Sequence, residues 1–249
     1  MAKESATRAV SKGICNFCKG EFGKAGMTQH LKSCKQRLSD IAEESTEAES
    51  TTKSKTRKPQ KTKIFHLLVE GLRLPEYWMH LEVTTGSTLT DLDRFLRNTW
   101  LECCGHLSAF RISNASYNSH GDMGWDMSAH NMSARLDKVL TPRLKFTHEY
   151  DFGTTTELGL KVVSEWEVEA KGKAIEIIAR NDPPKILCGV CGKLATQICT
   201  EHIYSEEGWL CDECMKAHEC GGEMVLPVVN SPRVGECGYT GQDSASVIF

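Results

Sequence analysis

At 249 residues, with 40% hydrophobic and 25% charged residues, the chain has the composition of a globular protein that can bury a core. It contains no apolar run of about 18 residues or more, and the segment MAKESATRAVSKG lacks the apolar stretch of a signal peptide, so neither a membrane span nor secretion is indicated. We therefore expect a cytoplasmic protein that does not associate with membranes. The chain has 12 cysteines, and in that setting those arranged as C-x2-C pairs beside histidines are expected to be thiolate metal ligands rather than disulfides.

The net charge of -3 is unevenly distributed along the chain. The first 63 residues hold 14 Lys and Arg against 7 Asp and Glu, whereas residues 64–249 hold 16 against 26. Because positive charge attracts phosphate and negative charge repels it, residues 1–62 are the part of the chain expected to contact nucleic acid.

The first metal-binding pattern lies in residues 13–35 and reads C-x2-C-x11-H-x3-C, with Cys15, Cys18, His30 and Cys34 as ligands. A tight turn presents the two cysteines, and the histidine and last cysteine, four residues apart, are expected on one helical face. The segment resembles the Cys-Cys-His-His zinc fingers with cysteine as the last ligand, although the central spacing is one residue shorter than usual. We expect one zinc ion here.

On such a finger, outward-facing residues near the start of the helix would contact nucleic acid. Those positions are occupied by Lys24, Ala25, Thr28, Gln29 and Lys32. A single finger reads only about three base pairs. The alternative is that the finger is a small metal-stapled unit, or a protein contact, with solvated lysines.

Residues 36–62 are predicted to form a disordered linker, because they contain almost no large apolar side chains that could offset the entropy of ordering. Its basic second half, KSKTRKPQKTK, either adds to phosphate attraction or is only a solvated tether.

In residues 63–180, several segments alternate apolar and polar side chains, as β-strands do, and one segment has the period of a helix. The strands are expected at IFHLLVEGL, YWMHLEV, LSAFRI, KFTHEY, LGLKVVSEW and AIEIIA, and the helix at 88–103. This predicts an α+β fold, an antiparallel sheet with one main helix. Within it we expect His80 to be a half-exposed strand residue, and Cys103 and Cys104 to be core or near-core thiols.

A polar loop, NASYNSHGDMGWDMSAHNM, carries His120, Asp122, Asp126 and His130. Those side chains could coordinate a metal in a fold that brought them together. Polar loops commonly carry such residues without one, so we treat the loop as structural and keep a site there as a subordinate enzyme hypothesis.

The order of elements from Ile64 to Trp166, and the motif Tyr150-Asp151-Phe152-Gly153, resemble the plasmid Ri ORF-three-like domain family. The resemblance covers roughly residues 63–180 and implies an α+β fold of unestablished biochemical function. Some members carry mobile-element labels. In the family the motif continues with Asp, Trp and His, where this chain has Thr154, Thr156 and Leu158. We therefore expect the Asp151 turn to be structural rather than catalytic, with Phe152 anchoring it in the core.

Two prolines, Pro183 and Pro184, mark the boundary into a Cys/His-rich module at 185–222. Its short ligand pairs alternate along the chain, so the expected arrangement is interleaved, resembling the cross-braced B-box and MYND modules. One zinc ion would be held by Cys188, Cys191, Cys211 and Cys214, and a second by Cys199, His202, His218 and Cys220. A single site built from the two C-x2-C pairs is the alternative.

The last segment, 223–249, is expected to be an irregular tail in which Cys237 is an unpaired thiol or a substitute ligand. Four-ligand sites rich in thiolate are closed and weakly Lewis acidic, so about three structural zinc ions and no catalytic residues are predicted. The sequence thus favours a zinc-binding interaction or adaptor protein with a protein partner. Nucleic-acid binding through residues 1–62, in a mobile-element context, is the alternative, and an enzyme is the less favoured one.

Overall fold

The computed structural model describes residues 11–39, 61–120, 130–168 and 172–241. The predicted linker at 36–62 therefore lies mostly outside the described residues, as do Asp122 and Asp126 of the polar loop. Within the described ranges, no helix is long and apolar enough to cross a membrane.

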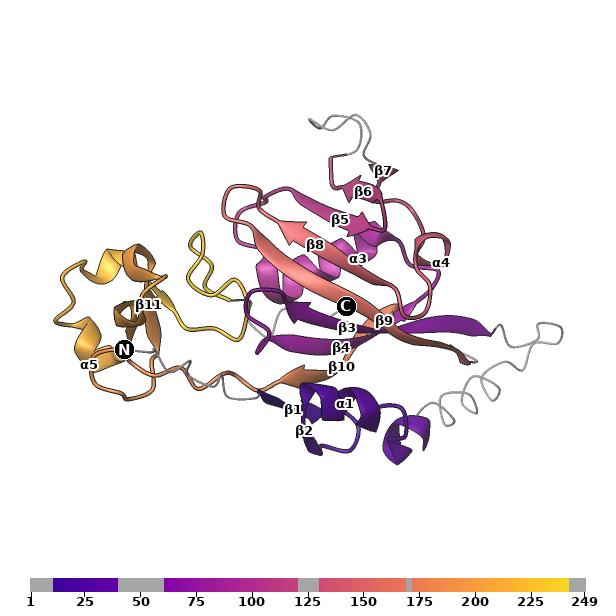
Figure 1. Ribbon diagram of the computed structural model, residues 1–249, viewed down its shortest axis with the longest axis horizontal. Helices are drawn as coiled ribbons and strands as arrows, with labels where there is room; N and C mark the ends of the chain where they lie inside the picture. Colours follow the sequence, from indigo (N-terminus) through magenta and orange to yellow (C-terminus); the bar gives the residue numbers. More distant parts are fainter. Residues whose placement is uncertain (1–10, 40–60, 121–129, 169–171, 242–249) are drawn as a thin grey trace, which may run out of the picture.

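Ten strands form one sheet in the order β2-β1-β10-β4-β3-β9-β8-β5-β6-β7 (Figure 1). Their bounds are β1 Lys12–Cys15, β2 Glu21–Gly23, β3 Thr62–Gly71, β4 Trp78–Thr84, β5 Ser108–Ile112, β6 Ala115–Asn118, β7 His130–Asn131, β8 Lys145–Tyr150, β9 Thr156–Val168 and β10 Ile175–Asn181. Neighbours pair antiparallel except β6 and β7, which are parallel. The predicted antiparallel α+β domain is thus a large mixed sheet with few helices.

Helices are short in this fold: α1 Lys24–His30, α3 Leu89–Leu96, α4 Leu136–Val139 and α5 Asp212–Met215. The helix predicted at 88–103 is α3 followed by a π-helical turn, η1, over Arg97–Leu101. It begins with a capping box, in which Thr88 Oγ1 accepts from the Asp91 amide at 3.2 Å and Asp91 Oδ2 accepts from the Thr88 amide at 2.9 Å.

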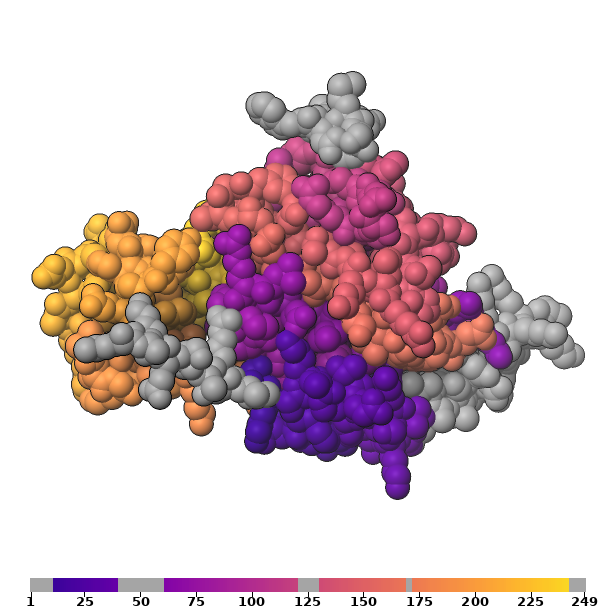
Figure 2. All heavy atoms as spheres, in the orientation of Figure 1, coloured from indigo at the N-terminus to yellow at the C-terminus, as the bar shows by residue number. Residues whose placement is uncertain are grey.

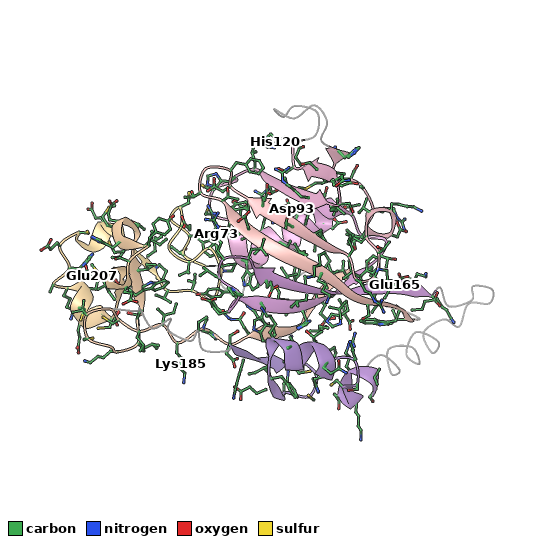
Figure 3. The ribbon with its side chains drawn as sticks, in the orientation of Figure 1. Arg73, Asp93, His120, Glu165, Lys185 and Glu207 are labelled. Atoms are coloured by element: carbon green, nitrogen blue, oxygen red, sulfur yellow. The ribbon has the colours of Figure 1, made fainter. Side chains whose placement is uncertain are left out.

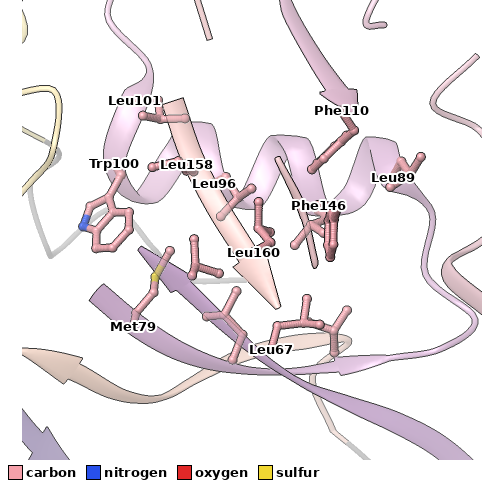
Figure 4. Packing of buried hydrophobic residues seen from close by; sticks show 14 of the residues in the cluster. Leu67, Met79, Leu89, Leu96, Trp100, Leu101, Phe110, Phe146, Leu158 and Leu160 are labelled. Atoms are coloured by element: carbon pink, nitrogen blue, oxygen red, sulfur yellow. The ribbon is translucent and has the colours of Figure 1, made fainter. Parts of the chain in front are cut away.

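The main core lies between α3 and the sheet (Figure 4). Leu89, Leu96 and Trp100 on the helical segment pack against alternate residues of the strands, such as Leu67 and Leu160. Alternation places every second strand side chain on this face. Burial of each such side chain contributes about 1.5–3 kcal/mol.

The finger packs on the opposite face of the sheet, and β1 hydrogen-bonds with β10. Met27 and Leu31 are fully buried against Trp78 and Ile178. The expected finger is therefore the edge of the central sheet as well as a metal-binding segment. In Figure 2 it is the indigo surface at the bottom of the view.

His80 is fully buried beneath the finger, so the prediction of a half-exposed residue was wrong. Alternation along β4 places it, with Trp78 and Glu82, on the face that the finger covers. Arg37, beyond the last cysteine of the finger, donates through Nε to Glu82 Oε1 at 2.8 Å in the same buried layer.

The C-terminal module forms a second sheet, in the order β12-β11-β13, at one end of the molecule (Figure 1). It comprises β11 Gln197–Cys199, η3 Thr200–His202, η4 Glu206–Gly208, β12 Trp209–Leu210, η5 Gly222–Met224 and β13 Val225–Pro227. Residues 228–241 then return to the central sheet. Ser231 Oγ donates to the Trp100 carbonyl at 2.6 Å, and Val234 and Tyr239 are buried. The described part of the expected irregular tail is thus packed against the core.

Candidate metal centres

Four groups of side chains place their sulfur and ring nitrogen atoms within 4.8 Å of one another and could hold metal ions. They are Cys15/Cys18/His30/Cys34, Cys188/Cys191/Cys211/Cys214, Cys199/His202/His218/Cys220 and Cys103/Cys104/His106/Cys237. These groups include all 12 cysteines of the chain. Each group contains four ligands, which is the number that structural zinc takes.

The separations between ligand atoms suit a tetrahedral ion. With metal bonds of about 2.3 Å to sulfur and about 2.05 Å to nitrogen, tetrahedral edges are about 3.8 Å between sulfurs and about 3.5 Å between sulfur and nitrogen. The sulfurs of Cys15 and Cys34 lie 3.9 Å apart, and those of Cys191 and Cys211 lie 3.6 Å apart. His202 Nδ1 lies 3.5 Å from the sulfurs of both Cys199 and Cys220. Disulfide sulfurs would be about 2.05 Å apart.

The first centre is formed by a turn and a helix end. The Cys15 carbonyl accepts from the Lys19 amide at 2.9 Å, and Lys19 has a φ of 59°, so the chain reverses within one tight turn and presents Cys15 and Cys18 together. Helix α1 ends at His30, and residues 31–33 form a turn before Cys34. The prediction that the last two ligands share one helical face was therefore wrong, although the turn still brings them to the same site.

The interleaved grouping expected for the C-terminal module is the one the structure shows. Gly192, with a φ of 73°, allows the turn after Cys191, and Cys211 is the N-cap of α5, which places Cys214 one turn further on. η3 follows Cys199 directly and includes His202. Each metal group therefore combines ligands from separate segments of the module, which is the cross-braced pattern.

Hydrogen bonds favour the thiolate form of one cysteine in each group of the module. Burial opposes ionisation of Cys188, yet the amides of Cys191, Cys211 and Val190 donate to its sulfur and lower the pKa of the thiol to about 6. Burial also opposes ionisation of Cys199, where the two histidines of the group outweigh it and lower the pKa to about 6. Thiolate is the form that binds metal.

The fourth group was not expected from the sequence. Cys103 is half-buried against the main core, as predicted for a near-core thiol, whereas Cys104 is exposed, so the prediction was wrong for that residue. Cys237 is not an isolated tail thiol, because all three cysteines meet His106. The only local signal is the Cys-Cys-x-His spacing after the end of a helix. The fourth ligand comes from a segment that no local pattern connects to it.

The residues predicted to contact nucleic acid divide into two sets. Lys24 forms an ion pair with Glu70 on β3, and Thr28 Oγ1 donates to the Lys24 carbonyl at 3.0 Å and lies 3.4 Å from His80 Nε2. Both are half-buried against the sheet, whereas Gln29 and Lys32 are exposed. Any nucleic-acid contact at this finger would rest on the second set.

Asp151 has a structural partner for each of its oxygens. It has a φ of 64° and accepts from the Gly153 amide at 3.0 Å and from Arg233 Nη2 at 2.7 Å. Burial opposes its ionisation, but the bonds from Arg233, Gly153 and Thr154 lower the pKa of this carboxyl to about 2. Phe152 is 51% exposed, so the prediction that it anchors the turn in the core was wrong.

The polar loop shows no grouping of its predicted residues within the part of the chain that is described. His120 and His130 are exposed and belong to none of the four groups.

No protein-family model matches the chain. No curated protein matches it. Among solved structures, the chain is similar to the crystal structure of a protein of unknown function, MM3350, from Methanosarcina mazei Go1, with 20% sequence identity and a TM-score of 0.41 over 49% of this chain and 70% of that chain. The relationship to the ORF-three-like domain family stays a prediction.

Proposed function

We propose that this chain is a non-catalytic interaction protein whose fold is held together by zinc and whose binding surface is a basic groove on the sheet. The groove lies on the face opposite α3, beside the finger, and has a volume of about 770 Å³. Its position follows from the fold, because the finger covers only the part of that face formed by β4, β10 and β3. We also propose a cytoplasmic setting, in which reducing conditions keep thiolate ligands intact.

The observation that carries the proposal is a pair of lysines. Lys145 on β8 and Lys161 on β9 are direct cross-strand partners, and both are exposed and line the groove. Like charges placed opposite each other destabilise a sheet. Arg111 also lines the groove, but Glu149 already compensates its charge through two hydrogen bonds of 2.8 and 3.1 Å. A negatively charged ligand would relieve this repulsion.

The apolar part of the groove lining favours a polypeptide as the partner. Leu68, Leu72 and Val163 line it, and Leu72 is 47% exposed. Apolar side chains offer little to a phosphate backbone but bury well against alternate side chains of an extended peptide. The partner that fits both features is an acidic peptide segment with interspersed apolar residues.

Closed metal sites support a non-catalytic role. Every group has four protein ligands, and a catalytic zinc normally keeps one position for water or substrate. The Asp151 carboxylate is engaged by Arg233 and its own turn. We therefore assign the metals to structure and the groove to binding.

The test is a binding titration with a fluorescently labelled peptide of alternating Glu and Leu. The full chain should bind it, and the double variant Lys145→Glu/Lys161→Glu should bind about tenfold or more weakly. The matched control is Lys138→Glu/Lys185→Glu, which reverses two exposed lysines outside the groove; Lys185 projects from the connector to the module (Figure 3). Equal loss in the two double variants would contradict the assignment of the groove.

Nucleic-acid binding is the second candidate, favoured by the exposure of Gln29 and Lys32 on the finger. The same titration with a labelled oligonucleotide distinguishes it. Binding that weakens with salt and is lost in Lys32→Glu, but not in Lys145→Glu/Lys161→Glu, would support this candidate over the peptide groove.

A further inference from the structure

Three cysteines remain after the finger and the C-terminal module have taken their ligands. They are Cys103, Cys104 and Cys237, and the structure places their sulfurs around His106 Nε2. That nitrogen lies 3.0 Å from Cys104 Sγ and 3.2 Å from Cys237 Sγ. The sulfur of Cys104 lies 3.7 Å from that of Cys103 and 3.9 Å from that of Cys237.

We propose that these four side chains bind a fourth zinc ion, which fastens the C-terminal tail to the central sheet. The sulfur separations match tetrahedral edges of about 3.8 Å and are far from the disulfide length of about 2.05 Å. Three thiolates and one imidazole form a recognised ligand set for structural zinc.

The backbone on both sides is shaped to present these ligands. The π-helical turn ends at Leu101, and Gly105, with a φ of 84°, reverses the chain so that Cys103, Cys104 and His106 meet. In the tail, Cys237 itself has a φ of 46°, a conformation that residues other than glycine adopt uncommonly. A strained position of this kind persists where its surroundings hold it, and a metal bond at Cys237 would do so.

A buried arginine provides the second, independent observation. Arg233 is fully buried, and its Nη2 lies 3.5 Å from Cys103 Sγ and donates to Asp151 Oδ2 at 2.7 Å. A zinc ion with three thiolates carries one net negative charge, and the guanidinium, which also pairs with Asp151, donates a hydrogen bond to one of these thiolates. Asp151 Oδ2 also lies 3.4 Å from His106 Nε2, so the Asp151 turn borders the site.

Thr154 and Thr156 hold the arginine in place. Its Oγ1 accepts from Arg233 Nη1 at 3.0 Å, and the Thr154 carbonyl accepts from the same nitrogen at 3.2 Å. The Asp151 turn, the arginine and the zinc ligands therefore form one connected unit at the end of the sheet.

This ion would join residues that are 131 positions apart in the chain, His106 and Cys237. It would hold the tail, and through the tail the C-terminal module, against the sheet. The site is independent of the groove, and loss of peptide binding would not bear on it.

Native mass spectrometry of the reduced full chain counts its zinc ions directly. The inference requires four ions in the unmodified protein and three in Cys237→Ser. Three ions in the unmodified protein would overturn it.

Histidine variants and thiol labelling complete the test without depending on one variant. His106→Ala should lose one ion, whereas His120→Ala, an exposed histidine outside all four groups, should keep four. In the unmodified protein, iodoacetamide should label Cys104 and Cys237 only after a chelator has removed zinc, although both are exposed. Labelling of both thiols before chelation would refute the site even if the variants failed to fold.

Discussion

At the scale of single residues, the buried histidine pair under the finger has a defined protonation state. The Thr28 hydroxyl donates to the Lys24 carbonyl, so it accepts from His80 Nε2. His80 Nδ1 then accepts from His66 Nε2 at 2.8 Å. His66 Nδ1 is buried without a partner among the described residues. Both rings are therefore neutral, and an added proton would have no acceptor.

This pair should make stability depend on pH. Burial, and then the neighbouring charges, lower the pKa of His66 to about 2 and that of His80 to about 3, with Arg37 acting on both and Lys32 on His66. Unfolded histidines titrate near pH 6.5, so below that pH the unfolded chain binds protons that the folded chain does not. The contribution of the two neutral histidines to stability should be complete above about pH 6.5. Below that pH, the free energy of unfolding should fall by up to about 1.4 kcal/mol per pH unit for each histidine.

Urea denaturation between about pH 7.5 and about pH 5.5 measures this slope. His66→Gln keeps a donor toward His80 but does not titrate, so its stability should fall less steeply than that of the unmodified chain. His130→Gln, at an exposed position of β7, is the matched control and should leave the slope unchanged. Identical slopes for His66→Gln and the unmodified chain would show that the pair does not titrate on unfolding.

Single residues also show what the sequence can and cannot predict. Cys188 and Cys191 are three positions apart, so the short spacing alone predicts that they share an ion. His80 was expected to be half-exposed, because alternation along a strand does not reveal what covers the second face. Cys237 could not be assigned, because its partners come from a segment 131 residues away.

At the scale of elements, the contact between β1 and β10 makes the finger part of the sheet. Gly13 lies in this contact, and a Cβ added there would be 2.1 Å from the Arg180 carbonyl oxygen. At Gly26, on the outer side of α1, the nearest atom to an added Cβ is Phe22 Cβ at 3.8 Å. Two glycines of one finger therefore differ in what they tolerate.

We predict that Gly13→Ala destabilises the protein by about 1–3 kcal/mol, because β1 must move away from β10. Gly26→Ala should be neutral or stabilise α1 by up to about 1 kcal/mol. Hydrogen exchange at the Asp182 amide, which donates to the Lys12 carbonyl at 2.8 Å, reports the contact directly. Faster exchange is expected in Gly13→Ala alone. Equal exchange rates in the two variants would mean that the finger is not held by this strand pair.

Element types were largely predictable and their pairing was not. The period-two pattern of KFTHEY predicts β8, and the Thr88 cap predicts the start of α3, since both signals are local. That β1 adds to the far edge of β10 depends on contacts between segments about 160 residues apart, such as Asn16 Nδ2 donating to the Ile177 carbonyl at 2.6 Å. No local pattern encodes such a contact.

At the scale of the whole molecule, the four groups lie where separate segments meet. One holds the finger at the sheet edge, two hold the C-terminal module, and the fourth lies between the tail and the end of the α3 segment. Arg180 and Asn181 of β10 add contacts to the tail, where the Asn230 side chain accepts from Asn181 Nδ2 at 2.7 Å. The metals, on this account, hold peripheral segments in place and leave the groove free to bind.

The most direct test of that account is X-ray absorption at the zinc edge of the full chain. Twelve cysteines and four histidines shared among four sites predict an average first shell of three sulfur atoms and one nitrogen, with no oxygen. This result would place every ion in a closed, structural site. An average with about two sulfurs and one or more oxygens per ion would reveal open coordination positions, and would contradict the claim that the metals only fasten the fold.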